Sequence, residues 1–324
     1  MEQHFAFAVE NASEAMRQNP QDPHAMMAAF WARWFPLVLE LNNKPETGLQ
    51  QLAKFEELGE LLKKVYTVVP SFHKLRSVSV ICRLTPFFTT QMTNGLEKGL
   101  WTKLDEQQQR VLTNCRDELL VLGNEIVEMR TSSLMFAAVS AWMMDERKST
   151  YLYLRQAADA APVETDALEL MAAFYAYESN WKQAQVIVEE ALKRKDTGKL
   201  LVWSGRVKAE QGRWKEALED FKKAVTYDDC VSLANLGLGV SLLKTGAPVA
   251  DTIVPLRTAW EKGANEPEVL LAWGVALALN GQLEEGRSCV ADALNRWPRT
   301  PSLDRVAKEL GLTLPQPGAT PAPG

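Results

Sequence analysis

The sequence has few of the residues that reactive sites use. Its 324 residues include three histidines, His4, His24 and His73, and none of them has the HExxH setting or the paired cysteine of a zinc site. The sequence also contains no phosphate-binding loop, nucleophile elbow or EF-hand motif. We therefore expect no catalytic residue, no metal site and no cofactor, and the sequence predicts a protein that is not an enzyme.

Cysteine is also scarce, and its placement bears on the compartment. Cys82, Cys115, Cys230 and Cys289 lie far apart and form no CxxC pair, which is typical of reduced, mostly buried thiols. The first residues lack the basic-then-apolar order of a signal peptide. Both observations favour a cytoplasmic location.

Long uncharged runs and strong net charge are missing as well. Outside the C-terminal tail, the longest uncharged run is Val269–Leu283, which is shorter than the roughly 20 residues that a membrane-spanning helix needs. The net charge of -5 gives no general attraction to nucleic acid or to an anionic membrane. We expect neither nucleic acid nor a membrane span among the features of this chain.

What the sequence does contain is a pair of amphipathic helical patterns between Leu200 and Asp229. The two patterns meet at Gln211–Gly212–Arg213. In the second, apolar residues follow the i, i+3, i+4, i+7 spacing of one helix face: Trp214, Ala217, Leu218, Phe221 and Ala224. Because so short a hairpin buries little surface alone, we expect neighbouring hairpins of the same kind.

Small residues recur on both sides of this stretch. Ala172, Gly205, Gly239 and Gly274 are separated by 33, 34 and 35 residues, and Ala191, Ala224, Ala259 and Ala293 by 33, 35 and 34. A helical hairpin repeated about every 34 residues resembles the tetratricopeptide-repeat (TPR) family. The resemblance implies an all-α, right-handed, TPR-like solenoid of helical hairpins.

The resemblance also suggests how the chain is divided. Residues 1–130 would form an N-terminal helical region, 131–312 the TPR-like array, and 313–324 a disordered tail rich in proline. The copies fall near 131–164, 165–197, 198–231, 232–266 and 267–300, followed by a capping helix at 301–312. Pro255 lies inside one copy and is expected to kink or restart its second helix.

The N-terminal region reads as a series of helices. Their expected ranges are 2–18, 24–41, 49–66, 72–83 and one or two helices within 96–130. The range 72–83 is rich in β-branched residues, and we favour a helix because no strand partner is visible. Pro36 is expected to bend or split its helix, and Pro86 to act as a break.

In TPR proteins the first helix of each repeat lines a concave surface where partners usually bind. Carried over to this sequence, that surface includes Tyr177, Val202, Arg206, Leu236, Val240, Leu243, Leu271 and Val275. Its largely apolar character suits an amphipathic helix or an apolar peptide. The resemblance therefore implies a non-enzymatic adaptor, scaffold or chaperone whose partner is another protein.

Three alternatives stay open at this point, and the first is an enzyme whose site lies in the N-terminal region. Second, the chain could be a structural subunit of a larger assembly, such as a bacterial secretion-type machine, that contacts its neighbours through the N-terminal helices. There the aromatic segment Phe30–Phe35 would form the contact, or else plain core, and homo-oligomers are compatible with either. The third alternative is that the chain fills its own groove or packs the wall as core.

Overall fold

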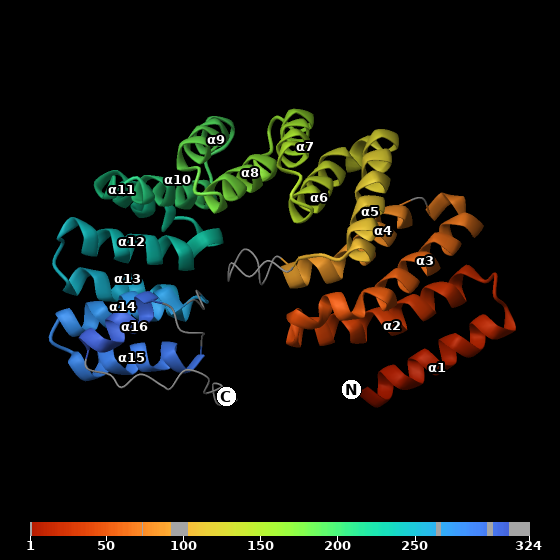
Figure 1. Cartoon of the computed structure of the whole chain (residues 1–324), viewed down its shortest axis with the longest axis horizontal. Helices are drawn as coiled ribbons and strands as arrows, with labels where there is room; N and C mark the ends of the chain where they lie inside the picture. Colours follow the sequence, from red (N-terminus) through yellow and green to blue (C-terminus); the bar gives the residue numbers. More distant parts are fainter. Residues whose placement is uncertain (1, 73, 92–102, 264–266, 297–300, 311–324) are drawn as a thin grey trace. The chain divides into compact units, whose positions relative to one another are not determined.

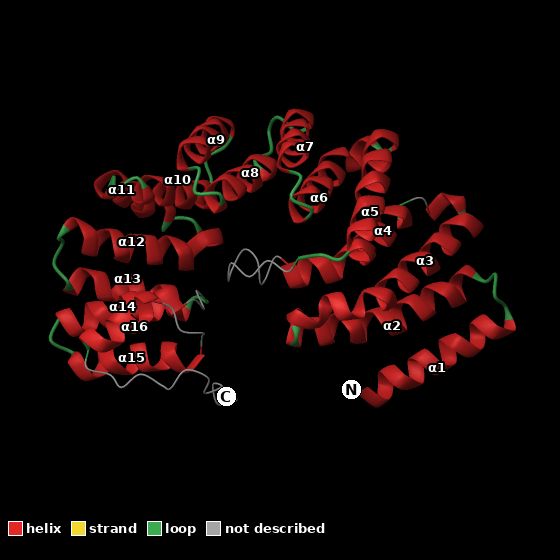
Figure 2. Cartoon of the chain, viewed as in Figure 1, coloured by secondary structure: helices red, strands yellow, loops and turns green. Residues whose placement is uncertain are grey.

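The computed structural model describes residues 2–72, 74–91, 103–263, 267–296 and 301–310. Within these ranges every regular element is a helix (Figure 2). The chain divides into two compact units, residues 1–162 and 163–324, and each is described by itself. The predicted tail at 313–324 lies outside the described residues.

The described residues of the N-terminal unit form seven α-helices (Figure 1). They are α1 (Glu2–Gln18), α2 (Pro23–Asn43), α3 (Leu52–Val68), α4 (Leu75–Phe87), α5 (Glu106–Glu125), α6 (Arg130–Met143) and α7 (Arg147–Ala160). Consecutive helices pack against each other along the chain, most extensively α1 with α2, α3 with α4, α5 with α6 and α6 with α7. The hairpin predicted as the first copy, α6 and α7, thus packs within this unit.

Two apolar clusters fill the interior of the N-terminal unit. One gathers residues of α1 to α4 around Phe55 and Leu62, and the other joins α3, α4, α5 and α6 around Leu84 and Leu112. Because both clusters draw on α4, that helix lies between them. Within the β-branched range 72–83, residues 75–83 belong to α4, so this part is helical as predicted.

In its described residues, the C-terminal unit consists of four helical hairpins and one further helix. The helices are α8 (Asp166–Tyr177), α9 (Trp181–Arg194), α10 (Gly198–Glu210), α11 (Trp214–Ala224), α12 (Val231–Thr245), α13 (Ala250–Glu261), α14 (Pro267–Leu279), α15 (Leu283–Arg296) and α16 (Pro301–Glu309). The hairpins lie close to the ranges expected for the copies from residue 165 onward, although α12 begins one residue before 232. Helix α16 packs on α14 and α15.

The recurring small residues mark close contacts between these helices. Gly205 of α10 and Gly237 of α12 both face the ring of Phe221, which lies between the two helices. Gly274 of α14 and Gly286 of α15 bring the two backbones of one hairpin together, since a Cβ at Gly286 would lie 2.5 Å from the Gly274 carbonyl oxygen. The small residues that recur about every 34 positions therefore mark sites where a larger side chain would force neighbouring helices apart.

Two of the three prolines do not interrupt their helices. Pro36 does not split α2 and Pro255 does not restart α13, so those expectations were wrong. Pro86 lies in the last turn of α4, which ends at Phe87 and is followed by a π-helical turn at residues 88–91. A proline in a helix interior costs about 3 kcal/mol through one lost hydrogen bond and a steric clash. Buried neighbours offset that cost: Leu256 and Ala259 follow Pro255 and are fully buried. Packing of the flanking residues keeps each helix intact.

Candidate functional site

The first helices of the four hairpins, α8, α10, α12 and α14, form a layer of their own. Each contacts the next one along the series (Figure 1), whereas the second helices, α9, α11, α13 and α15, do not approach one another as closely. A stack that is tighter on one side curves toward that side. We call the solvent-facing side of α8, α10, α12 and α14 the inner wall.

The structure places the eight predicted residues on these four helices, and none of them is buried. Tyr177 and Arg206 are exposed, and the other six are half-buried. Val240 and Leu243 belong to none of the core clusters described for the unit. Leu271 and Val275, in contrast, pack against the cluster that includes Val306 and Ala307 of α16. The part of the inner wall on α14 therefore also supports the last helix.

The sequence reasoning missed two leucines of the inner wall. Leu233 on α12 is 45% exposed and Leu279 on α14 is 64% exposed. Leu233, Leu236, Val240 and Leu243 lie at i, i+3, i+7 and i+10, so they share one face of α12. We call these four residues the α12 ridge. The same spacing in the sequence could have extended the predicted set by one turn.

Charge is unevenly distributed along the inner wall. On α10 the wall carries Lys199 and Arg206, which are exposed and lie on the same face as Val202. The Arg206 guanidinium lies 5.4 Å from the ring centroid of Trp203, a cation–π contact that orients it. On α8, Glu169 accepts a hydrogen bond of 2.8 Å from Thr165. The wall thus runs from acidic on α8 through basic on α10 to apolar on α12.

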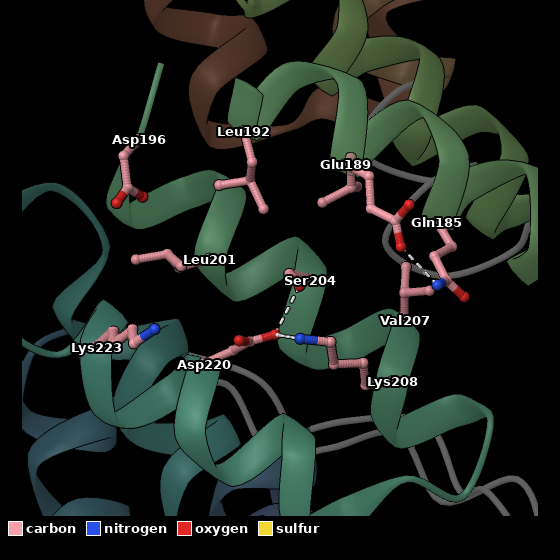
Figure 3. Close-up of a pocket in the computed structure, with 11 residues that line it drawn as sticks. Gln185, Glu189, Leu192, Asp196, Leu201, Ser204, Val207, Lys208, Asp220 and Lys223 are labelled. Carbon is pink, nitrogen blue, oxygen red and sulfur yellow. Dashed lines mark hydrogen bonds and ion pairs between the residues drawn. The ribbon is translucent and has the colours of Figure 1, made fainter. Parts of the chain in front are cut away.

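A separate cavity of about 300 Å³ lies on the other side of α10, between α9 and α11 (Figure 3). At its centre Asp220 accepts hydrogen bonds from Ser204 Oγ at 2.6 Å and from Lys208 Nζ at 2.5 Å, both to Oδ2. These contacts tie α11 to α10 through a mostly buried ion pair. None of the eight predicted residues lines this cavity, and α10 contributes Leu201, Ser204, Val207 and Lys208 to it instead of Val202 and Arg206.

The N-terminal unit contains a buried polar network. Arg83, only 5% exposed, donates from Nη1 to Glu118 Oε1 at 3.1 Å and also pairs through Nη2 with Oε2. Burial lowers the pKa of Arg83, but the hydrogen bond to Glu118 and the nearby negative charges, those of Glu118 and Glu60 among them, together outweigh it, and the net shift is upward. The guanidinium therefore stays charged and links α4 to α5.

Two thiols lie beside this network. Burial is the largest cause that raises the pKa of Cys82 and of Cys115 to about 12. Thiols with such pKa values stay protonated near neutral pH and are poor nucleophiles. Three of the four cysteines are buried and all four are free, as predicted.

The described residues hold neither a metal-binding cluster nor a helix able to cross a membrane. They contain no group of three or more His, Cys, Asp or Glu side chains placed to hold a metal ion. From the sequence, no metal-binding role is predicted for any of the three histidines. His24 is exposed, and the side chains of His4 and His73 lie outside the described residues. In the described part of the chain, no helix is both long and apolar enough to cross a membrane.

Comparison with known proteins defines the fold class. No protein-family profile and no curated protein matches the chain. Several similar solved structures are TPR proteins by name. The helical hairpins of this chain, together with its likeness to yeast Tom70, make the fold a TPR-like helical-hairpin solenoid preceded by an N-terminal helical region. The resemblance stated from the sequence is confirmed at the level of the fold.

Three of these structures illustrate the likeness. Yeast Tom70 is 12% identical with a TM-score of 0.59, and the match covers 95% of this chain but only 58% of Tom70. YrrB, described as a TPR protein with an unusual peptide-binding site, is 18% identical with a TM-score of 0.43, covering 57% of this chain and 96% of YrrB. A TPR protein from Parabacteroides merdae is 12% identical with a TM-score of 0.49, covering 82% of this chain and 96% of that one.

Proposed function

We propose that the inner wall binds a segment of another protein, and that the chain acts as a non-enzymatic adaptor, scaffold or chaperone in the cytoplasm. The observation that carries the proposal is the α12 ridge, whose leucine and valine side chains are exposed or half-exposed at one face of a packed helix. Exposed contiguous apolar surface on a soluble protein commonly marks an interaction site.

The distribution of charge on the inner wall indicates which chemical features the partner segment should have. The α12 ridge suits the apolar side of an amphipathic helix or an apolar peptide. Arg206 has no acidic residue paired with it among the ion pairs of the described residues, and it lies one helix away from the ridge. A partner segment with an apolar stripe and an acidic residue toward α10 fits this surface best.

The double substitution Leu236→Glu/Val240→Glu is expected to reduce partner binding at least tenfold. It places two carboxylates where the partner's apolar residues would be buried, and an unpaired buried charge costs several kcal/mol. The measurement is quantitative recovery of the binding partner from the protein's own cells, with tagged wild-type and variant chains compared side by side.

The matched control is Val186→Glu/Val254→Glu, which changes two exposed valines of the second helices α9 and α13. We expect this control to recover the partner as the wild type does. If a folded Leu236→Glu/Val240→Glu chain recovers as much partner as the wild type, the inner wall is not the binding surface. That result would leave the alternative role, a subunit of a larger assembly that uses the N-terminal helices.

A further inference from the structure

The cavity beside α10 combines an apolar wall with an excess of negative charge (Figure 3). Val188 of α9 and Leu201 and Val207 of α10 are buried side chains of that wall. Three carboxylates and two ammonium groups also line the cavity, which leaves one negative charge in excess. A ligand with an apolar stem and a positively charged end matches this combination.

One carboxylate of the cavity is buried and keeps an oxygen available. Asp220 is 8% exposed, whereas Glu189 and Asp196 are exposed at the rim. Its Oδ2 accepts from both Ser204 and Lys208, and within the described part of the chain no group donates to Oδ1. In Figure 3 the second oxygen of Asp220 points away from the Lys208 ammonium. A cationic N–H group would complete this buried acceptor.

The two rim carboxylates are not neutralised by ion pairs. Glu189 accepts a hydrogen bond from Gln185 Nε2 at 2.7 Å, and within the described ranges neither Glu189 nor Asp196 forms an ion pair. Lys223, the exposed ammonium of the lining, forms none there either. Because a cleft with an excess of one charge attracts the opposite charge, the lining favours a cation, and Lys223 weakens that attraction.

The arrangement at Asp220 favours an ammonium group over a guanidinium. Arginine binds a carboxylate best through two parallel hydrogen bonds, one to each oxygen. Two donors already occupy Oδ2, so a single oxygen is available, and the compact charge of an ammonium suits it. The volume of about 300 Å³ lies at the lower end of ligand pockets and fits one long side chain.

We propose that this cavity binds a lysine side chain of a second protein. The aliphatic stem packs along Val188 and Leu201, and the ammonium donates to Asp220 Oδ1. Because the rim is exposed at Glu189 and Asp196, a free amine would be covered only in part, whereas a side chain is also covered by the protein that carries it. The cavity and the inner wall lie on different sides of α10, so the proposal does not depend on the role of the wall.

A chemical-shift titration of the isotope-labelled full chain tests the proposal. The probe is N-acetyl-lysine amide, and N-acetyl-norleucine amide has the same stem without the ammonium group. The lysine probe should shift the backbone amide signals of Ser204 and Asp220, and the norleucine probe should bind roughly tenfold more weakly. Equal affinities for the two probes, or shifts confined to residues of the inner wall, would overturn the proposal. Tighter binding of pentylamine than of the lysine probe would overturn it too, because the cavity would then take a free amine.

Variants of the lining separate a binding role from a structural one, because they should change the affinity in opposite directions. Asp220→Asn should weaken binding of the lysine probe roughly tenfold. Lys223→Ala removes a competing cation and should strengthen binding about twofold. An unchanged affinity in a folded Asp220→Asn chain would contradict the proposal, as would weaker binding by Lys223→Ala.

A rim variant keeps the test valid if Asp220→Asn folds poorly. Glu189→Gln/Asp196→Asn changes two exposed residues and should weaken binding of the lysine probe about threefold. The matched control is Glu210→Gln/Asp251→Asn, which removes the same total charge at exposed positions of α10 and α13 outside the cavity. The control should bind the probe as the wild type does, and an equal loss in both double variants would show that the cavity does not select the cation.

Discussion

Replacing Phe221 by alanine is expected to destabilise the C-terminal unit by about 3–5 kcal/mol, the cost of emptying a buried phenylalanine site. The Phe221 ring is buried between α10 and α12, where Gly205 and Gly237 leave room for it. Without the ring, two glycine faces would border a cavity that rigid helices cannot close. Urea unfolding monitored by circular dichroism measures the change, and Glu219→Ala, at an exposed residue of α11, should stay within about 0.5 kcal/mol of the wild type.

The same packing predicts coupling between Phe221 and its glycine neighbours. A Cβ at Gly205 would lie 2.8 Å from Phe221 Cζ, and one at Gly237 would overlap the ring. Gly237→Ala alone should therefore destabilise the unit, and combined with Phe221→Leu it should cost less than the two single changes added together. Strict additivity would show that the ring and the glycine are not in contact.

Gly286→Ala is expected to destabilise the α14–α15 hairpin by about 1–3 kcal/mol through overpacking. A Cβ there would lie 2.5 Å from the Gly274 carbonyl oxygen and 3.0 Å from the Ala278 nitrogen. Both are backbone atoms, so no side-chain rotation relieves the clash and the two helices must separate.

The sign of the Gly286→Ala effect is the informative result. At an unobstructed helix position, alanine in place of glycine stabilises by about 1 kcal/mol. Thermal unfolding of Gly286→Ala and of the control Ser288→Ala, at an exposed position two residues on, separates the two cases. A raised melting temperature for Gly286→Ala would mean that α14 and α15 lie further apart than the structure shows.

The hairpins of the C-terminal unit could be predicted because their determinants are local and repeated. Ala172, Gly205, Gly239 and Gly274 stand where helices approach closely, so their spacing reports the period of the stack directly. Amphipathic spacing then supplied the helices of each copy. The expected restart at Pro255 failed because the cost of a proline is local, whereas the burial that offsets it, as at Leu256, comes from the tertiary structure.

The residues of the candidate site were harder to predict from the sequence than the helices. Spacing placed residues on the first helices, but the exposure of each depends on what packs beside it. Leu271 supports α16, while Leu233, outside the predicted set, is exposed. The cavity around Asp220 is lined by side chains from three helices. Because these residues are far apart in the sequence, no local pattern predicts that they lie together.

For the aromatic segment Phe30–Phe35 too, the sequence alone could not decide which side chains are buried. From the sequence it was either core or contact surface, and the structure divides it between the two. Phe30 is buried, whereas Trp31 and Phe35 are exposed one residue and five residues further on. Only the placement of α1 and α3 against α2 decides which side of the helix each ring occupies.

The central claim, that the inner wall binds another protein, is tested most directly by photo-crosslinking in the protein's own cells. A photoreactive phenylalanine analogue is placed at Val240 on the wall, and in a second chain at Val186 on the outer helix α9. The account predicts a covalent adduct with one partner protein from position 240 that is lost in the Arg206→Glu background, and none from position 186. Adducts from position 186 alone, or only intramolecular crosslinks from position 240, would contradict it.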